Sequence, residues 1–381
     1  MEKLVVFPLN NDTEILIKGL KENKLYQVVA VSSYIEDRSR LELLQKKSSI
    51  YCSTEFEECL TRADAIVFSE NTMGYSYDGY QKRVQMALDS GKKIYAGLAL
   101  LDKIQIDRDK VCILQESELS DEVVSPNKKE IDIPVISVMG LGENCDKFQL
   151  QVKIKKVIEK QGYRVLALCS NVLGGFLGME NLPGFLYSKF MSYPEKIIAL
   201  NHWIHTKVKQ QEYDVILVGC PGGVSEFEKY ETNYFGELPL IISNALDVDI
   251  GFLALYRYTD LNYTVLKNIS DFVLRKYNTP VKEYILSRQF YKADHEWKKI
   301  RYYTMEDMNE KPAIPENSEY QVLDIFDDTK IEKEILKILE ELANNIFVIR
   351  RLRNATSRIN TAFFVTYKQI TPHRIWYNRV D

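Results

Sequence analysis

One lysine, Lys147, lies where a phosphate-binding loop would place it. Residues 137–170 (SVMGLGENCDKFQLQVKIKKVIEKQGYRVLALCS) read as a buried strand, a tight turn, an amphipathic helix and a second strand. In such a loop, successive backbone N–H groups converge on a phosphate at a helix N-terminus, and the lysine reaches the outer phosphates. With Gly140 as first glycine and Gly142 inside the turn, the spacing predicts a slightly long phosphate-type loop.

Two residues of this loop argue against catalysis. Asp146 replaces the glycine that usually precedes the lysine, and we expect its carboxylate to cap the helix, which would stabilise it by roughly 0.3–1 kcal/mol. The same charge would then compete with a bound anion for the N–H groups. Phe148 replaces the hydroxyl residue that holds Mg²⁺, so this position offers no ligand to the metal.

A second segment, residues 214–223 (DVILVGCPGG), is an apolar strand that ends in a glycine turn. It resembles the strand of MinD-type and dethiobiotin-synthetase-like P-loop proteins, in which an apolar run precedes Asp, one residue and Pro-Pro-Gly. Gly219 takes the place of that magnesium-binding Asp, whereas Pro221, Gly222 and Gly223 keep the turn. The resemblance covers residues 134–290 and implies a degenerate P-loop-like fold, with ATP or GTP as the ligand if any binds. The phosphate-loop-like residues are Gly140, Gly142, Asn144, Asp146, Lys147, Gly219, Gly222 and Gly223.

Two loops carry apolar and aromatic residues that suit a surface for a partner or peptide. Residues 171–190 interleave glycines with large apolar groups, among them Phe176, Met179 and Phe185. Residues 69–80 follow a strand at the end where α/β sheets bind ligands, and they include Tyr75 and Tyr77. The competing interpretation is that both loops fold back onto their own core.

The remaining reactive side chains form no recognisable catalytic or metal motif. His202 and His205 lie one helical turn apart, a spacing that can chelate a metal, but no third ligand is evident nearby. Cys220 follows a strand beside Pro-Gly-Gly, where exposed N–H groups would lower its pKa, and the alternative is a buried thiol. We assign no catalytic and no metal-binding residue.

The first 125 residues alternate between β-branched runs and amphipathic helices, which predicts a Rossmann-like parallel-sheet domain. No G-x-G-x-x-G follows the first strand. The loop there is Asn10-Asn11-Asp12, and an acidic loop without glycine would repel a pyrophosphate. A dehydrogenase is therefore not expected.

A polar linker (residues 116–134) separates this domain from a second α/β unit, so the predicted fold class is α/β with two domains. The boundaries are 1–125 for the Rossmann-like domain, 134–310 for the degenerate P-loop-like domain and 315–381 for a small C-terminal extension. The extension should contain an amphipathic helix over residues 329–346 and a strand over 361–370, with basic residues from Arg350 to Arg379.

The composition is that of an ordinary globular chain. Of 381 residues, 45% are hydrophobic and 27% charged, and the net charge of −4 gives no reason to expect bulk binding to nucleic acid or membrane. No signal-peptide pattern is present at the first residues, no apolar run reaches the ~20 residues of a membrane span, and the six cysteines form no C-x-x-C pair. These features favour a cytoplasmic protein.

Across both domains, the chain resembles a clostridial family of peptide maturation system proteins, on the segments GLGENCDKFQLQ, GYRV, LPGFL and YDVILVGCPGGV. Genes of that family accompany radical-SAM enzymes and small cysteine-rich precursor peptides. The resemblance implies a process, the maturation of ribosomally made peptides, and no reaction.

Three hypotheses remain open. The first is a non-catalytic accessory protein of peptide maturation that binds a precursor peptide or the radical-SAM modifying enzyme. The second is a nucleotide-dependent enzyme of the same pathway that uses the loop around Lys147 with ATP or GTP. The third is a structural homodimer built through the C-terminal helix.

Overall fold

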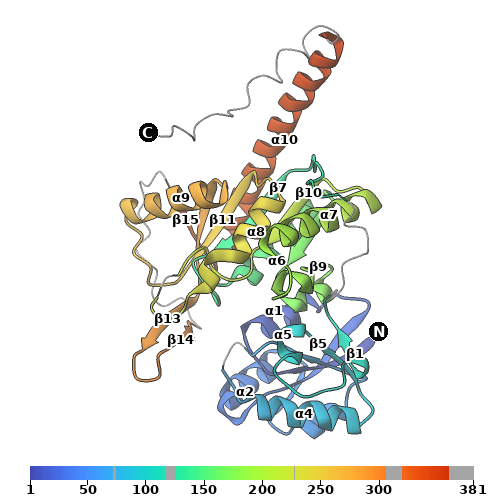
Figure 1. The fold of residues 1–381 in the computed structure, drawn as a ribbon. Coiled ribbons are helices and arrows are strands. Elements are labelled where there is room, and N and C mark those ends of the chain that lie inside the picture. The colour runs from blue at the N-terminus through green and yellow to red at the C-terminus, as the bar shows by residue number, and fades with distance from the viewer. Residues whose placement is uncertain (72–73, 116–124, 227, 306–319, 360–381) are drawn as a thin grey trace, which may run out of the picture. The chain divides into compact units, whose positions relative to one another are not determined.

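The computed structural model describes residues 1–71, 74–115, 125–226, 228–305 and 320–359, with side chains up to residue 344. The chain divides into two compact units, Met1–Glu332 and Lys333–Asp381. The first unit contains two separate parallel sheets with helices on their faces (Figure 1). The α/β class with two parallel-sheet domains, predicted from the sequence, is confirmed.

The first sheet has the strand order β3-β2-β1-β4-β5-β6, and its strands pair in parallel. This order is that of dinucleotide-binding folds, with a topological switch point between β1 and β4. The Rossmann-like layout is therefore present without its glycine fingerprint. The elements are β1 (Glu2–Phe7), α1 (Asn11–Gly19), β2 (Tyr26–Ser32), α2 (Arg38–Lys47), β3 (Tyr51–Ser53), α3 (Phe56–Leu60), β4 (Ala65–Phe68), α4 (Tyr77–Asp89), β5 (Lys93–Ala96), α5 (Leu98–Leu101) and β6 (Cys112–Ile113).

Aromatic rings fill the core of this first sheet. Phe7 of β1 contacts Phe56, Phe68 and Tyr80 with ring centroids 5.5–5.8 Å apart and steeply tilted planes. Such edge-to-face pairs stabilise a core beyond the area that they bury. They fix the carboxyl ends of β1 and β4, and with them the two loops that follow these strands.

The second sheet has the order β15-β12-β11-β7-β10-β8-β9. The chain leaves β7 toward β8 and β10 on one side and then returns to β11 and β12 on the other, so the carboxyl end of β7 is a second switch point. Its elements are β7 (Val135–Gly140), α6 (Lys147–Lys160), β8 (Val165–Cys169), β9 (Glu180–Asn181), α7 (Tyr193–Gln210), β10 (Val215–Gly219), α8 (Glu237–Ala245), β11 (Ile250–Leu255), α9 (Tyr263–Tyr277), β12 (Val281–Leu286) and β15 (Gln321–Asp324).

Helices α7, α8 and α9 bury their apolar residues in one core against this sheet, together with Val135 and Met139 of β7. Ile136 and Val138 alternate with these two residues and face the other side, where α6 contacts β7, β8 and β10. Burial on both faces explains why β7 is apolar along nearly its whole length. The phosphate-type loop, which we define as residues 140–147, is thus supported by a fully buried strand and a packed helix.

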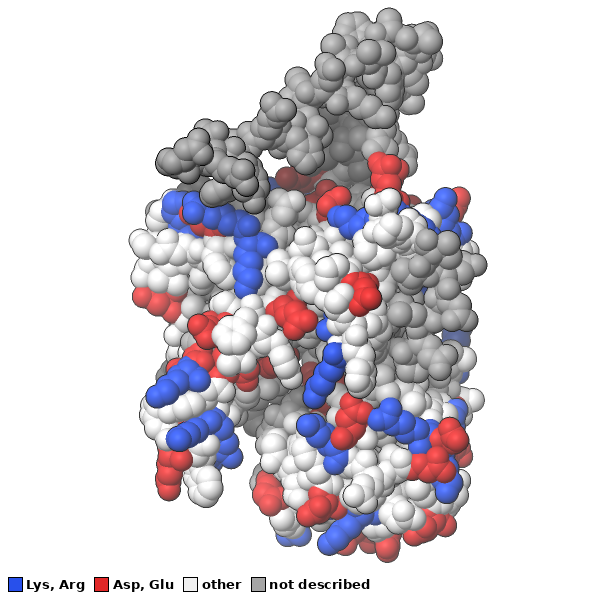
Figure 2. Space-filling model, viewed as in Figure 1, with Lys and Arg blue, Asp and Glu red and all other residues white. Residues whose placement is uncertain are grey.

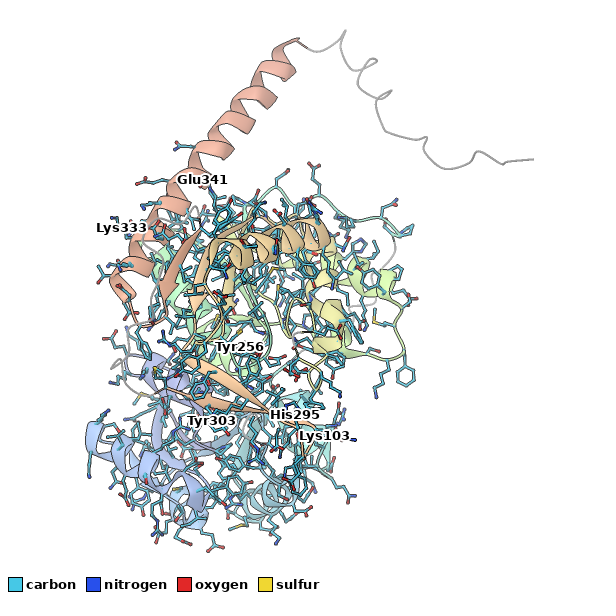
Figure 3. All side chains as sticks on the ribbon, turned by 90° about the vertical axis from the view of Figure 1, so that its left-hand side faces the viewer. Lys103, Tyr256, His295, Tyr303, Lys333 and Glu341 are labelled. Carbon is cyan, nitrogen blue, oxygen red and sulfur yellow. The ribbon has the colours of Figure 1, made fainter. Side chains whose placement is uncertain are left out.

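A two-stranded hairpin, β13 (Gln289–Asp294) and β14 (Lys299–Thr304), projects from this half of the molecule. In Figure 3, Tyr256 lies at the base of the hairpin and His295 near its tip. The rings of Tyr291 and Tyr302 pack on Tyr256, with centroids 5.0 and 6.1 Å away, and the Tyr256 hydroxyl donates to the Glu143 carbonyl at 2.5 Å. The hairpin therefore supports the phosphate-type loop.

The second unit contains most of α10 (Asp328–Ile359), a longer helix than the one predicted over residues 329–346. The predicted strand 361–370 and the basic side chains from Arg350 onward lie outside the described residues. Among the described residues, no helix combines the length and the apolar character that a membrane crossing requires.

Several features of these elements go beyond the apolar pattern of the sequence. Asn10 caps α1, because its side chain accepts from the Thr13 N–H at 2.9 Å and Thr13 reciprocates. The run 281–290 is divided between β12 and β13, which belong to different sheets. Strand β15 pairs with β12, which places Gln321–Asp324 in the second sheet instead of the C-terminal extension.

Candidate functional site: a cleft at two sheet switch points

The phosphate-type loop bends through two left-handed residues before α6 begins. Asn144 has φ 49° and Asp146 has φ 58°, both in the region that L-residues rarely adopt. Left-handed residues that alternate with right-handed ones turn successive N–H groups into one concavity, which is an anion-binding arrangement. Gly140 is required at the start, because a Cβ atom there would lie 2.4 Å from the Cys145 sulfur. The predicted strand–loop–helix unit is therefore present with phosphate-loop geometry.

Lys147 is held inside this loop. Its side chain is 9% exposed, and its Nζ donates to the Gly142 carbonyl at 2.7 Å and to the Gly222 carbonyl. Glu143 lies over it, with Oε2 3.7 Å from Nζ and Oε1 accepting from the Gly222 N–H at 2.9 Å. The lysine thus joins the loops that follow β7 and β10.

Asp146 does not behave as the sequence suggested. We expected its carboxylate to cap α6, but the side chain makes no capping hydrogen bond to the helix. It turns away and accepts from the Ser287 hydroxyl and the Arg288 N–H, both at 2.8 Å, and from the Arg288 Nε at 3.2 Å. The guanidinium balances the charge, so this carboxylate does not compete with an anion for the N–H groups of the loop.

The two positions without magnesium ligands have structural explanations. Phe148 is buried, with 7% exposure. At Gly219, a Cβ atom would lie 2.5 Å from the Gln151 Oε1. The Gln151 side chain is itself buried and donates to the Leu168 carbonyl at 2.7 Å. The amide of Gln151 therefore fills the space that a carboxylate at residue 219 would need, and the usual magnesium coordination does not fit here.

The glycine turn after β10 is packed directly on the phosphate-type loop. A Cβ atom at Gly223 would lie 2.2 Å from the Leu141 carbonyl oxygen and 2.4 Å from the Asn233 Nδ2. Asn233 donates to that same Leu141 carbonyl at 3.1 Å and to the Ser225 carbonyl at 2.7 Å. The predicted residues Gly140, Gly142, Asn144, Asp146, Lys147, Gly219, Gly222 and Gly223 all lie at or beside this junction.

Carboxylates from the first sheet face the same cleft. Asp12 follows β1 and Glu70 follows β4, so both lie at the switch point of that sheet. The pKa of Asp12 is raised to about 6 and that of Glu70 to about 7, chiefly by burial, and the charge of Glu143 contributes to both shifts. On the outer face seen in Figure 2, by contrast, the acidic and basic side chains of the described residues are interspersed.

The raised pKa of Glu70 has a consequence for stability. A carboxyl with a folded pKa near 7 and an unfolded pKa of about 4.3 contributes stability below pH ~4 that is lost as the pH rises through 7. Glu70→Gln removes the charge that must be desolvated. We therefore expect the variant to have a higher melting temperature than the wild type at pH 8 and the same melting temperature at pH 4. Calorimetric melting curves measure this difference. Glu42→Gln, at an exposed residue of α2, should show no pH-dependent gain, and an equal gain there would contradict the explanation.

The cleft has a volume of about 1320 Å³ and is lined from both sheets. Asp12, Glu70 and the segment from Leu98 to Ile106 line it from the first sheet, while Lys147 and Tyr187 line it from the second. Sites for small molecules usually measure about 300–1,000 Å³. The two switch points therefore open into one space that is larger than a small ligand needs.

The predicted partner surface is not formed by most of its residues. Phe176, Met179 and Phe185 are only 4–6% exposed, and of these three Phe185 borders the cleft. The Phe176 ring contacts Tyr26 at 5.0 Å, so the apolar loop packs against the chain's own first domain. This correction has a simple physical reason: two sheets in one compact unit cover each other's apolar loops.

The tyrosine loop divides between core and surface. Tyr75 is half-buried, stacks on Tyr34 with ring centroids 4.2 Å apart, and donates to Asp37 at 2.7 Å. Tyr77 is 38% exposed at the start of α4. Tyr75 is thus engaged within the fold, and Tyr77 alone of the five predicted surface residues presents a substantially exposed side chain.

The other candidate side chains are structural. Burial raises the pKa of the Cys220 thiol to about 12, opposite to what a reactive cysteine needs. His202 is buried and its Nε2 lies 2.8 Å from the Asn127 carbonyl. In the part of the chain that the structure describes, no three His, Cys, Asp or Glu side chains gather as a group that could hold a metal ion.

Four residues of the cleft and its supports escaped the sequence-based analysis: Glu70, Gln151, Asn233 and Arg288. Glu70 directly follows an apolar strand, which is a usable signal for a ligand-facing residue. The other three act through partners 17 to 142 positions away, and no local pattern marks them.

Comparisons with known proteins bear on the fold. No family model matches the sequence, and the comparison with curated proteins finds no relative. Among solved structures, a DUF1611 family protein from Anabaena variabilis is 14% identical with a TM-score of 0.53, covering 75% of this chain and 88% of that chain.

Two further structures are matched at lower similarity. An ADP-bound nucleotide-binding protein from Archaeoglobus fulgidus is 15% identical over 54% of this chain and 87% of that chain, with a TM-score of 0.29. Cobyrinic acid a,c-diamide synthase from Mycobacterium smegmatis is 16% identical over 40% and 74%, with a TM-score of 0.27. TM-scores this low support no inference about this chain, whereas the likeness to the DUF1611 family protein shows a shared fold.

Proposed function

We propose that this protein binds a phosphate-bearing small molecule in the cleft, with the phosphate at the loop 140–147, and that it does so without the usual magnesium ligands. One observation carries the proposal: the Asp146 carboxylate is turned away from the loop and paired with Arg288. The N–H groups of the bend are then not blocked by this carboxylate, and a bound anion would replace Glu143 and the Gly142 and Gly222 carbonyls as the partner of the Lys147 cation. ATP and GTP, expected from the sequence, are the first ligands to test.

Binding without turnover is the form that the site supports best. Phe148 and Gly219 offer no oxygen to a magnesium ion, and Gln151 fills the space behind Gly219. The raised pKa values of Asp12 and Glu70 reflect desolvated carboxyls that face the loop from the other sheet. Such groups suit contacts to a second part of the ligand more than contacts to its phosphates.

Lys147→Ala is expected to weaken nucleotide binding by about 10- to 100-fold, since a charged hydrogen bond contributes about 1.5–3 kcal/mol. Isothermal titration calorimetry with ATP, GTP and tripolyphosphate measures the change. Lys156→Ala is the matched control, because Lys156 is exposed on the same helix. Unchanged affinity of a folded Lys147→Ala variant, or no binding of any of the three probes to the wild type, would contradict the proposal.

A role in peptide maturation is our second proposal, and the size of the cleft favours it. A volume of about 1320 Å³ leaves room for an extended segment beside a phosphate ligand. In this reading the protein is a non-catalytic accessory that presents a precursor peptide to its radical-SAM modifying enzyme. Calorimetric titration with a purified cysteine-rich precursor peptide tests it, and the absence of heat both with and without nucleotide would count against it.

A further inference from the structure

The turn Asn233–Gly236, hereafter the aromatic turn, has a strained backbone. Asn233, Tyr234 and Phe235 all have left-handed φ values, of 49°, 50° and 53°, and Gly236 follows at 76°. Left-handed helical geometry costs a non-glycine residue roughly 1–2 kcal/mol. Strain of this kind persists only where the surroundings enforce it, and it concentrates at ligand sites.

Hydrogen bonds at both ends of the aromatic turn hold its backbone in place. At its start, the buried Asn233 side chain donates to the Leu141 carbonyl at 3.1 Å, which ties the turn to the phosphate-type loop. At its end, Lys276 Nζ donates to the Phe235 carbonyl at 2.7 Å, and the Tyr277 hydroxyl lies 3.5 Å from the Gly236 carbonyl. These anchors hold the backbone of the turn in a fixed position relative to the loop 140–147.

The side chain at the centre of the turn faces the cleft. Tyr234 is 73% exposed and lines the cleft beside Glu143 and Pro221. Phe235 is 65% exposed but is not among the residues that line the cleft. An aromatic ring left largely uncovered on a strained, anchored turn is expected where a ligand covers it.

A second ring lines the same cleft. Tyr187 also lines the cleft, at the end of the 3-10 helix Gly184–Tyr187, with 46% of its surface exposed. Glu70, Glu143 and Tyr234 line the same cleft, and burial followed by the charges of Glu70 and Glu143 raises the pKa of Tyr187. The cleft therefore presents two tyrosine rings beside the phosphate-type loop.

We infer that Tyr234, with Tyr187 as a second ring, stacks on the planar base of a nucleotide whose phosphates occupy the loop 140–147. This inference rests on the proposed phosphate binding and specifies its ligand as a nucleotide, in contrast to a sugar phosphate or a bare polyphosphate. Aromatic side chains bind bases by stacking, because every base offers a π-face. The anchors of the aromatic turn fix the backbone that carries Tyr234 before the ligand arrives, which lowers the entropic cost of binding.

The experiment compares ATP with tripolyphosphate, which carries the phosphates without the base, on the full chain. We expect the wild type to bind ATP at least about tenfold more tightly than tripolyphosphate, since one stacked base contributes that much or more. Tyr234→Ala should remove this difference and leave tripolyphosphate affinity unchanged, whereas Tyr234→Phe should retain it. Phe235→Ala, at the neighbouring exposed ring of the same turn, is the matched control and should bind both probes as the wild type does.

The outcomes separate this inference from the proposed function. Equal affinity of the wild type for ATP and tripolyphosphate would overturn the stacking site while phosphate binding stands. ATP affinity that is unchanged in Tyr234→Ala would overturn it as well. If neither probe binds the wild type, the proposed phosphate site itself fails, and the stacking site fails with it.

Discussion

Arg288→Ala should lower the free energy of unfolding by about 3 kcal/mol, the lower end of the cost of breaking a buried ion pair. The Asp146 side chain is 2% exposed, and Arg288 is its cationic partner at 3.2 Å. Three donors remain in the variant and limit the loss: the Ser287 hydroxyl, the Arg288 N–H and, at 3.4 Å, the Gln289 Nε2. Chemical denaturation measures the effect. The freed carboxylate should also weaken anion binding at the loop.

The double variant Asp146→Asn with Arg288→Ala tests whether the unpaired charge of Asp146 causes the loss of stability in Arg288→Ala. Because an amide carries no charge, we expect it to recover much of the lost stability and of the lost anion affinity. Arg164→Ala is the matched control: its ion pairs with Glu212 and Asp214 are exposed to solvent and screened, so its cost should be far smaller than that of Arg288→Ala. Equal losses in the single and double variants would show that the charge of Asp146 is not what Arg288 balances.

Gly223→Ala should be at least as disruptive, with a loss of about 3 kcal/mol or more in unfolding free energy, at or above the upper end of overpacking costs. The new methyl group would lie 2.2 Å from the Leu141 carbonyl oxygen and 2.4 Å from Asn233 Nδ2. Neither neighbour can move freely, because the carbonyl belongs to the phosphate-type loop and the amide anchors the aromatic turn. We therefore expect loss of nucleotide affinity together with loss of stability.

Gly91→Ala is the control for this prediction. Gly91 has φ +65° and open space around its Cα, so alanine there meets no atom and carries only the left-handed backbone cost of roughly 1–2 kcal/mol. If Gly223→Ala were as stable as Gly91→Ala, the prediction would be wrong. The two loops at this junction could then move apart to accommodate a methyl group at little cost.

The alternation of apolar runs with amphipathic helices was enough to predict both parallel sheets. Runs such as VVF in β1 and VISVM in β7 are buried on both faces, and that burial is what makes a parallel strand recognisable in a sequence. The hairpin β13–β14 and the short strands β3, β6, β9 and β15 were missed. Their half-exposed or very short runs carry no strong period, and their pairing depends on distant strands.

The start of α8 shows a related limit. Helix propensity would allow α8 to begin at Tyr234, but Tyr234 and Phe235 adopt left-handed geometry and the helix begins at Glu237. Aromatic residues are tolerated in helices, so propensity alone favoured the earlier start. The anchors supplied by Asn233 and Lys276 override it.

For the candidate site, residue identity alone located the phosphate-type loop and showed that the hydroxyl and the carboxylate of a magnesium site are replaced by Phe148 and Gly219. Those statements follow from side-chain chemistry and spacing, which no fold can change. The tertiary structure alone decided where the Asp146 charge points, because its partner Arg288 lies 142 positions away. It also decided that Phe176 and Phe185 are buried and that the two switch points share one cleft, since apolar loops are covered by whichever surface the packing of two sheets brings to them.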